Sequence, residues 1–211
     1  MSERDFDFWW NVAGDWVEPP NYRRNGWSGM VRASIDGRIH YVKRQLNHRC
    51  YTLGHPFGWP TASREWQYLL RLRELGIGAP VPVFHGARRT VEGVEAVVVT
   101  EELTGYRDLS GWAGLAPDAR RALAATVGAL LGRLHRARLQ HSSLYGKHVM
   151  ARRDGEGFTV ALIDLEKMRP RLFAGMAARH DLEQLRRRQD LFDDADWAAL
   201  TAAHAARFSG A

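Results

Sequence analysis

The sequence predicts an α+β protein in two lobes, and two observations lead to this expectation. Strand patterns and glycine turns dominate the first half of the chain, whereas long apolar stripes with helical spacing dominate the second half. The length of 211 residues is enough for one domain or for two small lobes. The expected parts are an N-terminal extension over residues 1–25, a strand-rich lobe over 26–103 and a small helical lobe over 104–211.

The chain is basic. Thirty Lys and Arg against 24 Asp and Glu give a formal charge of +6, which favours anionic partners such as nucleotides, nucleic acid or a phosphorylated lipid surface. The single cysteine, Cys50, excludes a disulfide framework and a Cys-based zinc site, and it suits a reducing compartment. No window approaches the roughly 18 to 20 apolar residues of a spanning helix, and the N-terminus is acidic and aromatic rather than signal-like. We therefore expect a cytoplasmic protein whose membrane contact is at most peripheral.

The first strands form a predicted hairpin. Residues 27–45 alternate in polarity around a turn at Asp36-Gly37, and the second strand carries Lys43. Farther along, the apolar run Ala96 to Val99 is typical of a buried strand. The acidic pair Glu101-Glu102 follows it directly, so these carboxylates are expected at the end of that strand.

A helix is predicted between these strands, over residues 62–75, and Gly76 ends it. Within this helix Glu65, Leu69 and Leu72 have the spacing i, i+4 and i+7. Residues at this spacing share one face of a helix. The Glu65 carboxylate is therefore expected to point inward with the two leucines.

The second half is predicted to be helical around one further strand. A long helix begins near Pro117 and carries a wide apolar stripe. Residues 158–163 form an apolar strand that leads directly to Asp164, and two more helices are expected over residues 180–192 and 193–208. The polar motifs lie between these elements.

Four features in chain order have the chemistry that phosphoryl transfer requires. They are Lys43 on a strand, Glu65 on a helix, the loop HSSLYGKHVM over residues 141–150, and Asp164 after a strand. A lysine holds nucleotide phosphates, a carboxylate orients the lysine, and oxygen ligands bind magnesium. Each feature also has a purely structural interpretation, because strand lysines are commonly solvated and an Asp after a strand is often a cap.

The segments GWSGMV, YVKRQ, SREWQYLLRL, QHSSLYGKHVM and ALIDLEK together resemble the lipopolysaccharide core kinase family, the Kdo/WaaP group with its InaA-like branch. The resemblance spans roughly residues 26 to 190, and it depends on the order and spacing of the five segments. It implies a two-lobed protein-kinase-like fold that uses ATP and Mg²⁺. It also implies a hydroxyl acceptor such as a heptose or Kdo sugar of the lipopolysaccharide core.

In the first lobe, the resemblance assigns nucleotide-binding roles. Gly26 and Gly29 would belong to the turn that covers the phosphates, although a hairpin needs glycine for backbone reasons as well. Lys43 would hold the phosphates, with Glu65 as its ion-pair partner. Glu101 to Leu103 would form the hinge along which adenine lies.

In the second lobe, the resemblance assigns metal and loop residues. Asp164 takes the place of the magnesium-binding aspartate, in the form DLE, and His148 takes the place of the loop asparagine that helps to hold a second metal. Because magnesium prefers oxygen ligands, His148 is either a weaker metal ligand or a structural replacement that hydrogen-bonds the loop. Asp181 is similar to the buried aspartate that braces the catalytic loop, and His141 is expected to be a bracing residue too.

The carboxylate that accepts the proton of the attacking hydroxyl is missing, because Ser143 stands at its position. Serine is a poor base unless another group activates it. Three hypotheses follow: a phosphotransferase in which Glu166, Tyr145 or a substrate group replaces the base, a nucleotide-binding pseudokinase that regulates or scaffolds an envelope or stress response, and a basic binding protein without a nucleotide site. The presence of Lys43 together with Glu65 and Asp164 disfavours the third.

The remaining partner predictions depend on charge and aromatic content. Arg186 to Arg188 are consistent with binding to a phosphate-rich lipid headgroup or an anionic envelope sugar, and equally with a solvated helix face. The pattern of alternating aromatic and basic residues typical of nucleic-acid modules is missing, so no nucleic acid is expected. The cluster Phe8-Trp9-Trp10, together with Trp16, is expected to pack onto the body of the protein, with a lid over the cleft as the alternative. Peripheral contact would be at the cytoplasmic face of the inner membrane.

Overall fold

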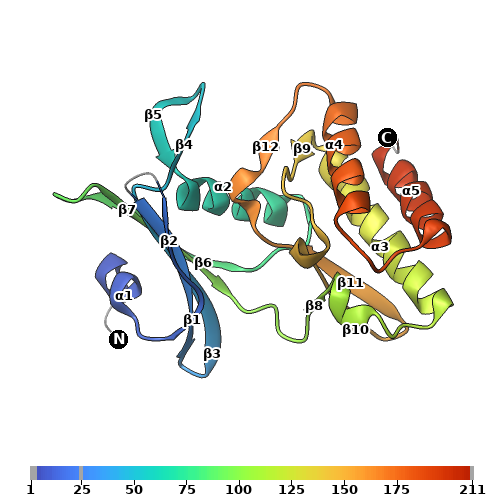
Figure 1. The fold of residues 1–211 in the computed structure, drawn as a ribbon, viewed down its shortest axis with the longest axis horizontal. Helices are drawn as coiled ribbons and strands as arrows, with labels where there is room; N and C mark the ends of the chain where they lie inside the picture. Colours follow the sequence, from blue (N-terminus) through green and yellow to red (C-terminus); the bar gives the residue numbers. More distant parts are fainter. Residues whose placement is uncertain (1–3, 24–25, 210–211) are drawn as a thin grey trace. The chain divides into compact units, whose positions relative to one another are not determined.

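The computed structural model describes residues 4–23 and 26–209, and the chain folds into two compact units (Figure 1). Unit 1 comprises Met1–Arg71 and Pro80–Leu103, and unit 2 comprises Leu72–Ala79 and Thr104–Ala211. Unit 1 is built mainly from strands and unit 2 mainly from helices, so the predicted α+β class is confirmed. No helix among the described residues has the length and apolar content required to cross a bilayer.

Unit 1 contains a five-stranded antiparallel sheet in the order β1-β2-β3-β7-β6. The predicted hairpin around Asp36 and Gly37 is confirmed, and both residues have positive φ, as a two-residue turn requires. Strand β3 lies at the centre of the sheet between β2 and β7, so its side chains are the best shielded. The strands are β1 (Asp15–Arg23), β2 (Gly26–Ile35), β3 (Arg38–Leu46), β6 (Pro82–Arg89) and β7 (Val94–Glu101).

The two edge strands of this sheet, β1 and β6, were not anticipated from the sequence. Both contain proline, at Pro19, Pro20 and Pro82, and both pair irregularly with their neighbours. Proline has no N–H to donate to a ladder and is therefore tolerated at an edge. Strand β1 pairs with β2, so residues from the expected N-terminal extension lie in the same sheet as Lys43.

The aromatic residues Phe8, Trp9 and Trp10 pack on one face of the sheet, as predicted, whereas Trp16 of β1 is 45% exposed. Helix α1 (Phe6–Asn11) buries Trp9 against a valine layer that includes Val42, and Asp5 caps the helix by accepting from the Phe8 N–H at 3.0 Å. Because successive strand residues face opposite sides of a sheet, Lys43 projects from the face opposite to Val42.

The chain between β3 and β6 forms a second hairpin and a helix. Strands β4 (Arg49–Thr52) and β5 (His55–Pro60) make the hairpin, and helix α2 (Thr61–Glu74) follows at once. The helix ends as predicted at Gly76, whose φ of +62° is costly for any other residue.

Unit 2 has three long helices and a three-stranded sheet in the order β11-β10-β8. Three helices were predicted here, and α4 begins at Ala174, six residues before the expected start at residue 180. The elements are β8 (Arg107–Asp108), η1 (Leu109–Trp112), α3 (Pro117–Arg136), β9 (Leu139–Gln140), η2 (Gly146–His148), β10 (Val149–Asp154), β11 (Gly157–Leu162), η3 (Leu165–Lys167), β12 (Arg169–Pro170), α4 (Ala174–Arg187) and α5 (Asp194–Phe208).

Helices α3 and α5 pack closely because glycine stands twice on the contact face of α3. A Cβ on Gly128 would overlap the Leu200 carbonyl, and a Cβ on Gly132 would overlap the His204 carbonyl. The close approach of the two backbones brings His204 of α5 next to His135 of α3, with 2.9 Å between Nε2 and Nδ1.

Candidate functional site

Lys43 and Glu65 form a buried ion pair in unit 1. The Lys43 Nζ donates to Glu65 Oε2 at 2.9 Å, and the two residues are only 7% and 8% exposed. The predicted inward orientation of the Glu65 carboxylate is therefore confirmed. Taking two charges out of water is costly unless they are well paired, so this pair needs the fixed geometry that the sheet and helix provide.

Gln45 sets that geometry. It lies two residues after Lys43 on the same face of β3, and its amide is bonded to the first turn of α2. Gln45 Nε2 donates to Thr61 Oγ1 at 2.9 Å, and the Ala62 N–H donates to Gln45 Oε1 at 2.8 Å. The start of α2 is thus fixed against the strand that carries Lys43. Glu65, one turn into the helix, then meets the lysine.

The two predicted phosphate-covering glycines lie within strand β2. Gly26 pairs with Arg23 of β1, and Gly29 pairs with Arg44 of β3. A Cβ on Gly26 would overlap the Leu46 carbonyl, so close packing accounts for glycine there without a ligand. The two residues that join β1 to β2 fall outside the described part of the chain, and the phosphate-covering role of this turn stays a prediction.

The predicted hinge, Glu101 to Leu103, follows directly from β7. The Glu101 N–H donates to the Val81 carbonyl at 2.9 Å and the Glu102 N–H donates to the Ile39 carbonyl at 3.0 Å. The carboxylates of Glu101 and Glu102 accept from arginine side chains on the neighbouring strands. Two of the hinge N–H groups are therefore already bonded within unit 1, and a role in adenine binding stays a prediction that falls mainly on Leu103.

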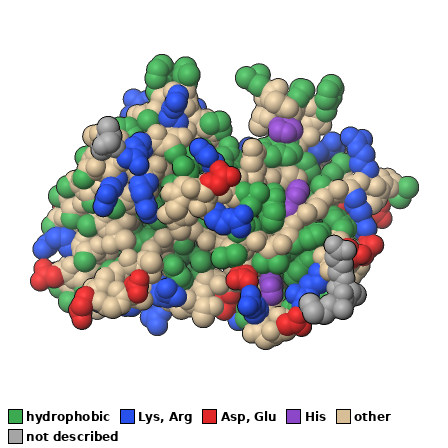
Figure 2. Space-filling view, turned by 180° about the vertical axis from the view of Figure 1, so that it is seen from behind, with side chains coloured by type: hydrophobic (Ala, Val, Ile, Leu, Met, Phe, Trp, Pro, Cys, Tyr) green, Lys and Arg blue, Asp and Glu red, His purple; other side chains and the backbone are tan. Residues whose placement is uncertain are grey.

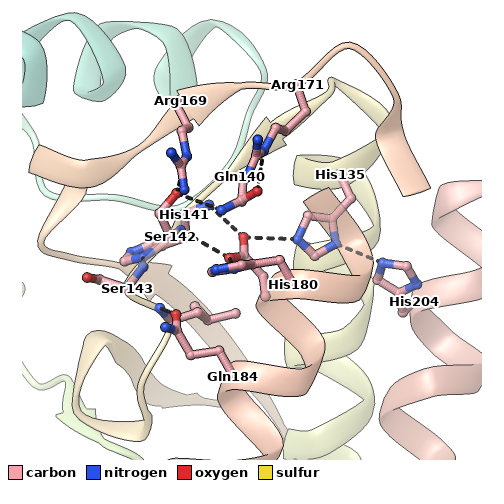
Figure 3. Close-up of polar contacts among 12 residues, drawn as sticks. His135, Gln140, His141, Ser142, Ser143, Arg169, Arg171, His180, Gln184 and His204 are labelled. Atoms are coloured by element: carbon pink, nitrogen blue, oxygen red, sulfur yellow. Dashed lines mark hydrogen bonds and ion pairs between the residues drawn. The ribbon is translucent and has the colours of Figure 1, made fainter. Parts of the chain in front are cut away.

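The loop that begins at His141 is held from below by two side chains of α4 in unit 2. Asp181 accepts from the N–H of His141 at 2.6 Å and of Ser142 at 3.0 Å, and Gln184 accepts from the N–H of Leu144 at 2.5 Å (Figure 3). The bracing role that the resemblance implied for Asp181 agrees with these contacts. Asp181 and Gln184 are three residues apart, so one helix face carries both acceptors.

His141 braces the loop through both nitrogens of its ring. Its Nε2–H donates to the Ile163 carbonyl at 2.9 Å, and its Nδ1 accepts from the Ser143 N–H at 3.3 Å, which fixes the tautomer. Burial lowers the pKa of the imidazole, partly opposed by the negative charge of Asp181. His141 thus connects the loop to the strand end that precedes Asp164.

Behind the loop, three buried side chains form a hydrogen-bond chain from α5 to α4. His204 Nε2–H donates to His135 Nδ1 at 2.9 Å, and His135 Nε2–H donates to Asp181 Oδ2 at 3.3 Å (Figure 3). Burial alone raises the pKa of Asp181, but hydrogen bonds from His135 and the loop N–H groups outweigh it, so the pKa lies below its usual value. Burial, with a smaller effect of His135, lowers the pKa of His204 to about 4.

In unit 2, Ser143, His148 and Asp164 are the residues predicted to take part in catalysis or metal binding. The Ser143 carbonyl accepts from His148 Nδ1 at 2.6 Å, and His148 Nε2 lies 3.5 Å from Asp164 Oδ2. The structure therefore brings His148 and Asp164 together, and it also gives His148 the loop-bonding contact of the structural hypothesis. Asp164 has φ +60° and ψ +57°, a strained conformation typical of functional turns.

The donor set around Asp164 fits a magnesium ion that keeps several waters. Because His148 donates through Nδ1, its Nε2 presents a lone pair toward the Asp164 carboxylate when the ring is neutral. Two acceptors facing each other at 3.5 Å are compatible with a cation between them. Magnesium bound to a nucleotide commonly uses only one or two protein ligands, and the described residues contain no cluster of three or more His, Cys, Asp or Glu that would suggest a dedicated metal centre.

A cavity of about 600 Å³ opens beside the loop in unit 2. Tyr145 and Lys147 line it from the loop, Arg188 and Asp190 from the segment after α4, and Asp108 from the end of β8. The Gly146 N–H donates to the Arg188 carbonyl at 2.9 Å, which holds the two walls together. The lining therefore combines an aromatic ring, cations and carboxylates.

Sequence reasoning missed the side chains that position the predicted residues. Gln45, Gln184, His135 and His204 contact segments that are distant in sequence, and no periodic pattern marks them. A weak signal existed for Gln184, because it lies on the same helix face as Asp181.

The sheet unit with its buried lysine–glutamate pair, and the helical unit with a braced loop and an aspartate after a strand, define a protein-kinase-like fold. A solved structure described as WaaP in complex with acyl carrier protein has this fold, with a TM-score of 0.73 and 24% sequence identity over 94% of this chain and 81% of that chain.

The sequence comparisons are more specific. The lipopolysaccharide kinase (Kdo/WaaP) family matches residues 7–204. The chain is 33% identical over 204 residues to Protein InaA of Escherichia coli (strain K12), covering 94% of both proteins. It is 28% identical over 199 residues to lipopolysaccharide core heptose(I) kinase WaaP of Pseudomonas aeruginosa, covering 81% of this chain and 72% of that protein. The chain therefore belongs to the lipopolysaccharide kinase (Kdo/WaaP) family, as the sequence resemblance indicated.

Proposed function

We propose that this protein is an ATP- and Mg²⁺-dependent phosphotransferase that transfers the γ-phosphate to a hydroxyl of a lipopolysaccharide core sugar such as heptose or Kdo. Family membership supports a phosphotransferase of the lipopolysaccharide-kinase type. The observation that carries ATP use is the buried Lys43–Glu65 pair, at 2.9 Å.

A purely structural role explains this pair poorly. Well-packed apolar residues of similar volume commonly stabilise a protein as much as a buried ion pair, or more. Phosphoryl transfer, by contrast, needs a lysine whose ammonium is held in one position for the phosphates. Glu65 and the Gln45 contacts to α2 supply that fixed position.

Asp164 and His148 are the proposed magnesium ligands. When bound, magnesium would neutralise charge that develops on the phosphate oxygens. The His141 bond to the Ile163 carbonyl and the His148 bond to the Ser143 carbonyl would hold the two ligands in place. The imidazole at position 148 makes the second ligand weaker than an oxygen donor for this ion.

Ser143 makes the proposed chemistry slow rather than impossible. General-base assistance contributes about 100- to 10,000-fold, whereas phosphoryl transfer depends chiefly on positioning and charge stabilisation. Glu166, Tyr145 or a group of the substrate would take the proton in place of an aspartate.

The cavity beside the loop supports a sugar as the acceptor. Lys147 and Arg188 would contact an anionic substituent, Asp108 and Asp190 would accept from hydroxyls, and the Tyr145 ring would lie against a pyranose face. The relative from P. aeruginosa is itself named a heptose kinase.

Calorimetric titration with ATP, with and without magnesium, tests the nucleotide part of the proposal. The wild type is expected to bind ATP more tightly with magnesium, and Lys43→Ala is expected to lose roughly tenfold or more in both conditions because a charge-assisted bond to phosphate disappears. Asp164→Asn should lose only the increment due to magnesium, and Asp154→Asn in the β10–β11 turn is the matched control. Undetectable binding by the wild type, or binding unaffected by both substitutions, would show that the assignment is wrong.

A nucleotide-binding pseudokinase with a regulatory role is the second candidate, and Ser143 is the observation that favours it. ATP turnover on candidate core sugars separates the two, with wild type and Ser143→Asp compared side by side. Turnover by the wild type supports the phosphotransferase. A silent wild type beside an active aspartate variant supports the pseudokinase.

A further inference from the structure

An exposed group of apolar side chains stands at the start of α4 in unit 2. Leu172, Phe173 and Met176 are 74%, 63% and 44% exposed, although each could pack in a core. In Figure 2 the start of α4 lies at the upper left, where hydrophobic side chains form the outer end of the protrusion and Lys and Arg side chains lie beside them. Monomeric proteins rarely expose such clusters unless they bind something.

The same segment is densely cationic. Residues 167–180, KMRPRLFAGMAARH, carry Lys167, Arg169, Arg171 and Arg179 and no acidic residue. Lys167, Arg169 and Arg179 are exposed. The nearest following carboxylate, Asp181, is fully buried and accepts from the loop N–H groups. We call the three apolar and four cationic side chains the basic apolar patch.

The basic apolar patch is presented by ordered structure. Strand β12 pairs with β9, and Arg169 Nε donates to Ser142 Oγ at 3.1 Å while Arg171 Nε donates to Gln140 Oε1 at 2.5 Å (Figure 3). Met168 and Ala177 of the same segment are fully buried. The segment thus buries one of its faces in unit 2. The exposed apolar side chains lie on its other face and are held there by an ordered backbone.

We propose that the basic apolar patch docks this protein on an anionic lipid surface. Projecting apolar side chains enter the boundary between headgroups and acyl chains, and neighbouring cations attract the anionic headgroups. The β4–β5 hairpin of unit 1 also exposes Leu53 and Phe57. Its strands carry a single arginine, however, so the hairpin lacks the group of cations that would attract anionic headgroups.

This inference goes beyond the proposed nucleotide chemistry and does not depend on it. Strand β12 lies against β9, the strand that leads into the His141 loop, and Arg169 contacts Ser142 of that loop directly. A bilayer bound at the patch would therefore present lipid-linked hydroxyls close to the loop.

Vesicle flotation without nucleotide tests the proposal. The full chain is mixed with vesicles of phosphatidylethanolamine and phosphatidylglycerol, or of phosphatidylcholine alone, at about 0.1 M salt, where headgroup charge still acts over roughly 10 Å. The wild type is expected to float with the anionic vesicles and to remain behind with the neutral ones. Equal binding to both vesicles, or binding to neither, would overturn the proposal.

Two variants test the patch itself. Leu172→Ser/Phe173→Ser should lower partitioning at least about tenfold because two large apolar side chains no longer enter the bilayer. Serine is also well suited to the N-cap position that Phe173 occupies, so folding should be preserved. Arg179→Gln, which leaves the loop contacts intact, should lower partitioning roughly fivefold.

The matched control is Arg89→Gln/Val91→Ser, which removes an exposed cation and an exposed apolar side chain from unit 1. It should partition like the wild type. If Arg179→Gln and the double serine variant both float like the control, the patch is not the docking surface. Sedimentation velocity supplies an independent check, since a wild-type dimer that becomes monomeric in the double serine variant would make the patch an interface between copies and overturn the proposal.

Discussion

The lysine–glutamate pair of unit 1 and the His141 loop of unit 2 are both buried polar groups held in fixed positions, but the interactions that hold them differ. In unit 1 two buried opposite charges hold each other, at 2.9 Å, and uncharged Gln45 fixes the helix that carries one of them. In unit 2 a single buried carboxylate, Asp181, collects donors from the loop and from His135. The comparison shows that unit 1 fixes a charged pair by mutual attraction, whereas unit 2 fixes a loop backbone by giving its N–H groups one shared acceptor.

The largest expected effect comes from breaking the pair in unit 1. Lys43→Met leaves the Glu65 carboxylate buried without its cation, and we expect the free energy of unfolding to fall by about 3–5 kcal/mol. Lys43→Met/Glu65→Leu should recover most of that loss and still fail to bind ATP. Urea unfolding and calorimetry measure the two quantities separately.

The control for this prediction is Lys167→Met, an exposed lysine whose replacement should change the free energy of unfolding by no more than about 0.5 kcal/mol. ATP binding retained by the double variant would show that the pair is structural, and the contrast between the two units would then disappear.

The corresponding change in unit 2 is Asp181→Asn. One amide oxygen cannot accept all the N–H groups that the carboxylate serves, and the new NH₂ group faces donors, so we expect a loss of about 3 kcal/mol. Hydrogen exchange should become faster at the N–H groups of His141 and Ser142. Asp118→Asn is the control because that side chain is 98% exposed. Unchanged exchange at the loop would mean that Asp181 does not hold it.

The histidines of unit 2 predict a pH dependence of stability that is larger than that of unit 1, where burial lowers the pKa of His85. The pKa of His204 is about 4 in the fold against 6.5 for an ordinary histidine. Between pH 6.5 and about 4 the unfolded chain therefore takes up a proton that the folded chain does not, and stability falls as pH falls. We expect a loss of about 3 kcal/mol across this window from His204, at about 1.4 kcal/mol per pKa unit.

Replacement of His204 by glutamine should reduce this slope without abolishing it, because burial also lowers the pKa of His141. His55→Gln, at an exposed histidine of the β4–β5 hairpin, is the control. Chemical unfolding at a series of pH values measures the slope, and an identical slope in the wild type and the His204 variant would contradict the prediction.

What the sequence could predict differs between the same two regions. Lys43, Glu65 and Asp164 could be proposed as site residues because each lies on or just after an element with clear periodicity, and because their order resembles that of a known family. The edge strands β1 and β6 were missed because proline interrupts the strand pattern, which an edge tolerates and a sequence pattern does not reveal. The chain from His204 to Asp181 joins residues on three helices, and only their packing brings them together.

The smallest effect we predict tests whether the pair in unit 1 depends on its uncharged support. Gln45→Ala removes an acceptor from the first turn of α2, and loss of a helix cap costs about 1 kcal/mol. The first turn of α2 is then less ordered, so the position of Glu65 and of the Lys43 ammonium should vary more. The ion pair should persist, and ATP affinity should fall only a few-fold. Gln67→Ala on the exposed face of the same helix is the matched control and should change neither quantity. A loss of ATP binding as large as that of Lys43→Met would mean that Gln45 contacts the nucleotide itself, whereas no change at all would mean that the sheet positions the lysine without help from the helix start.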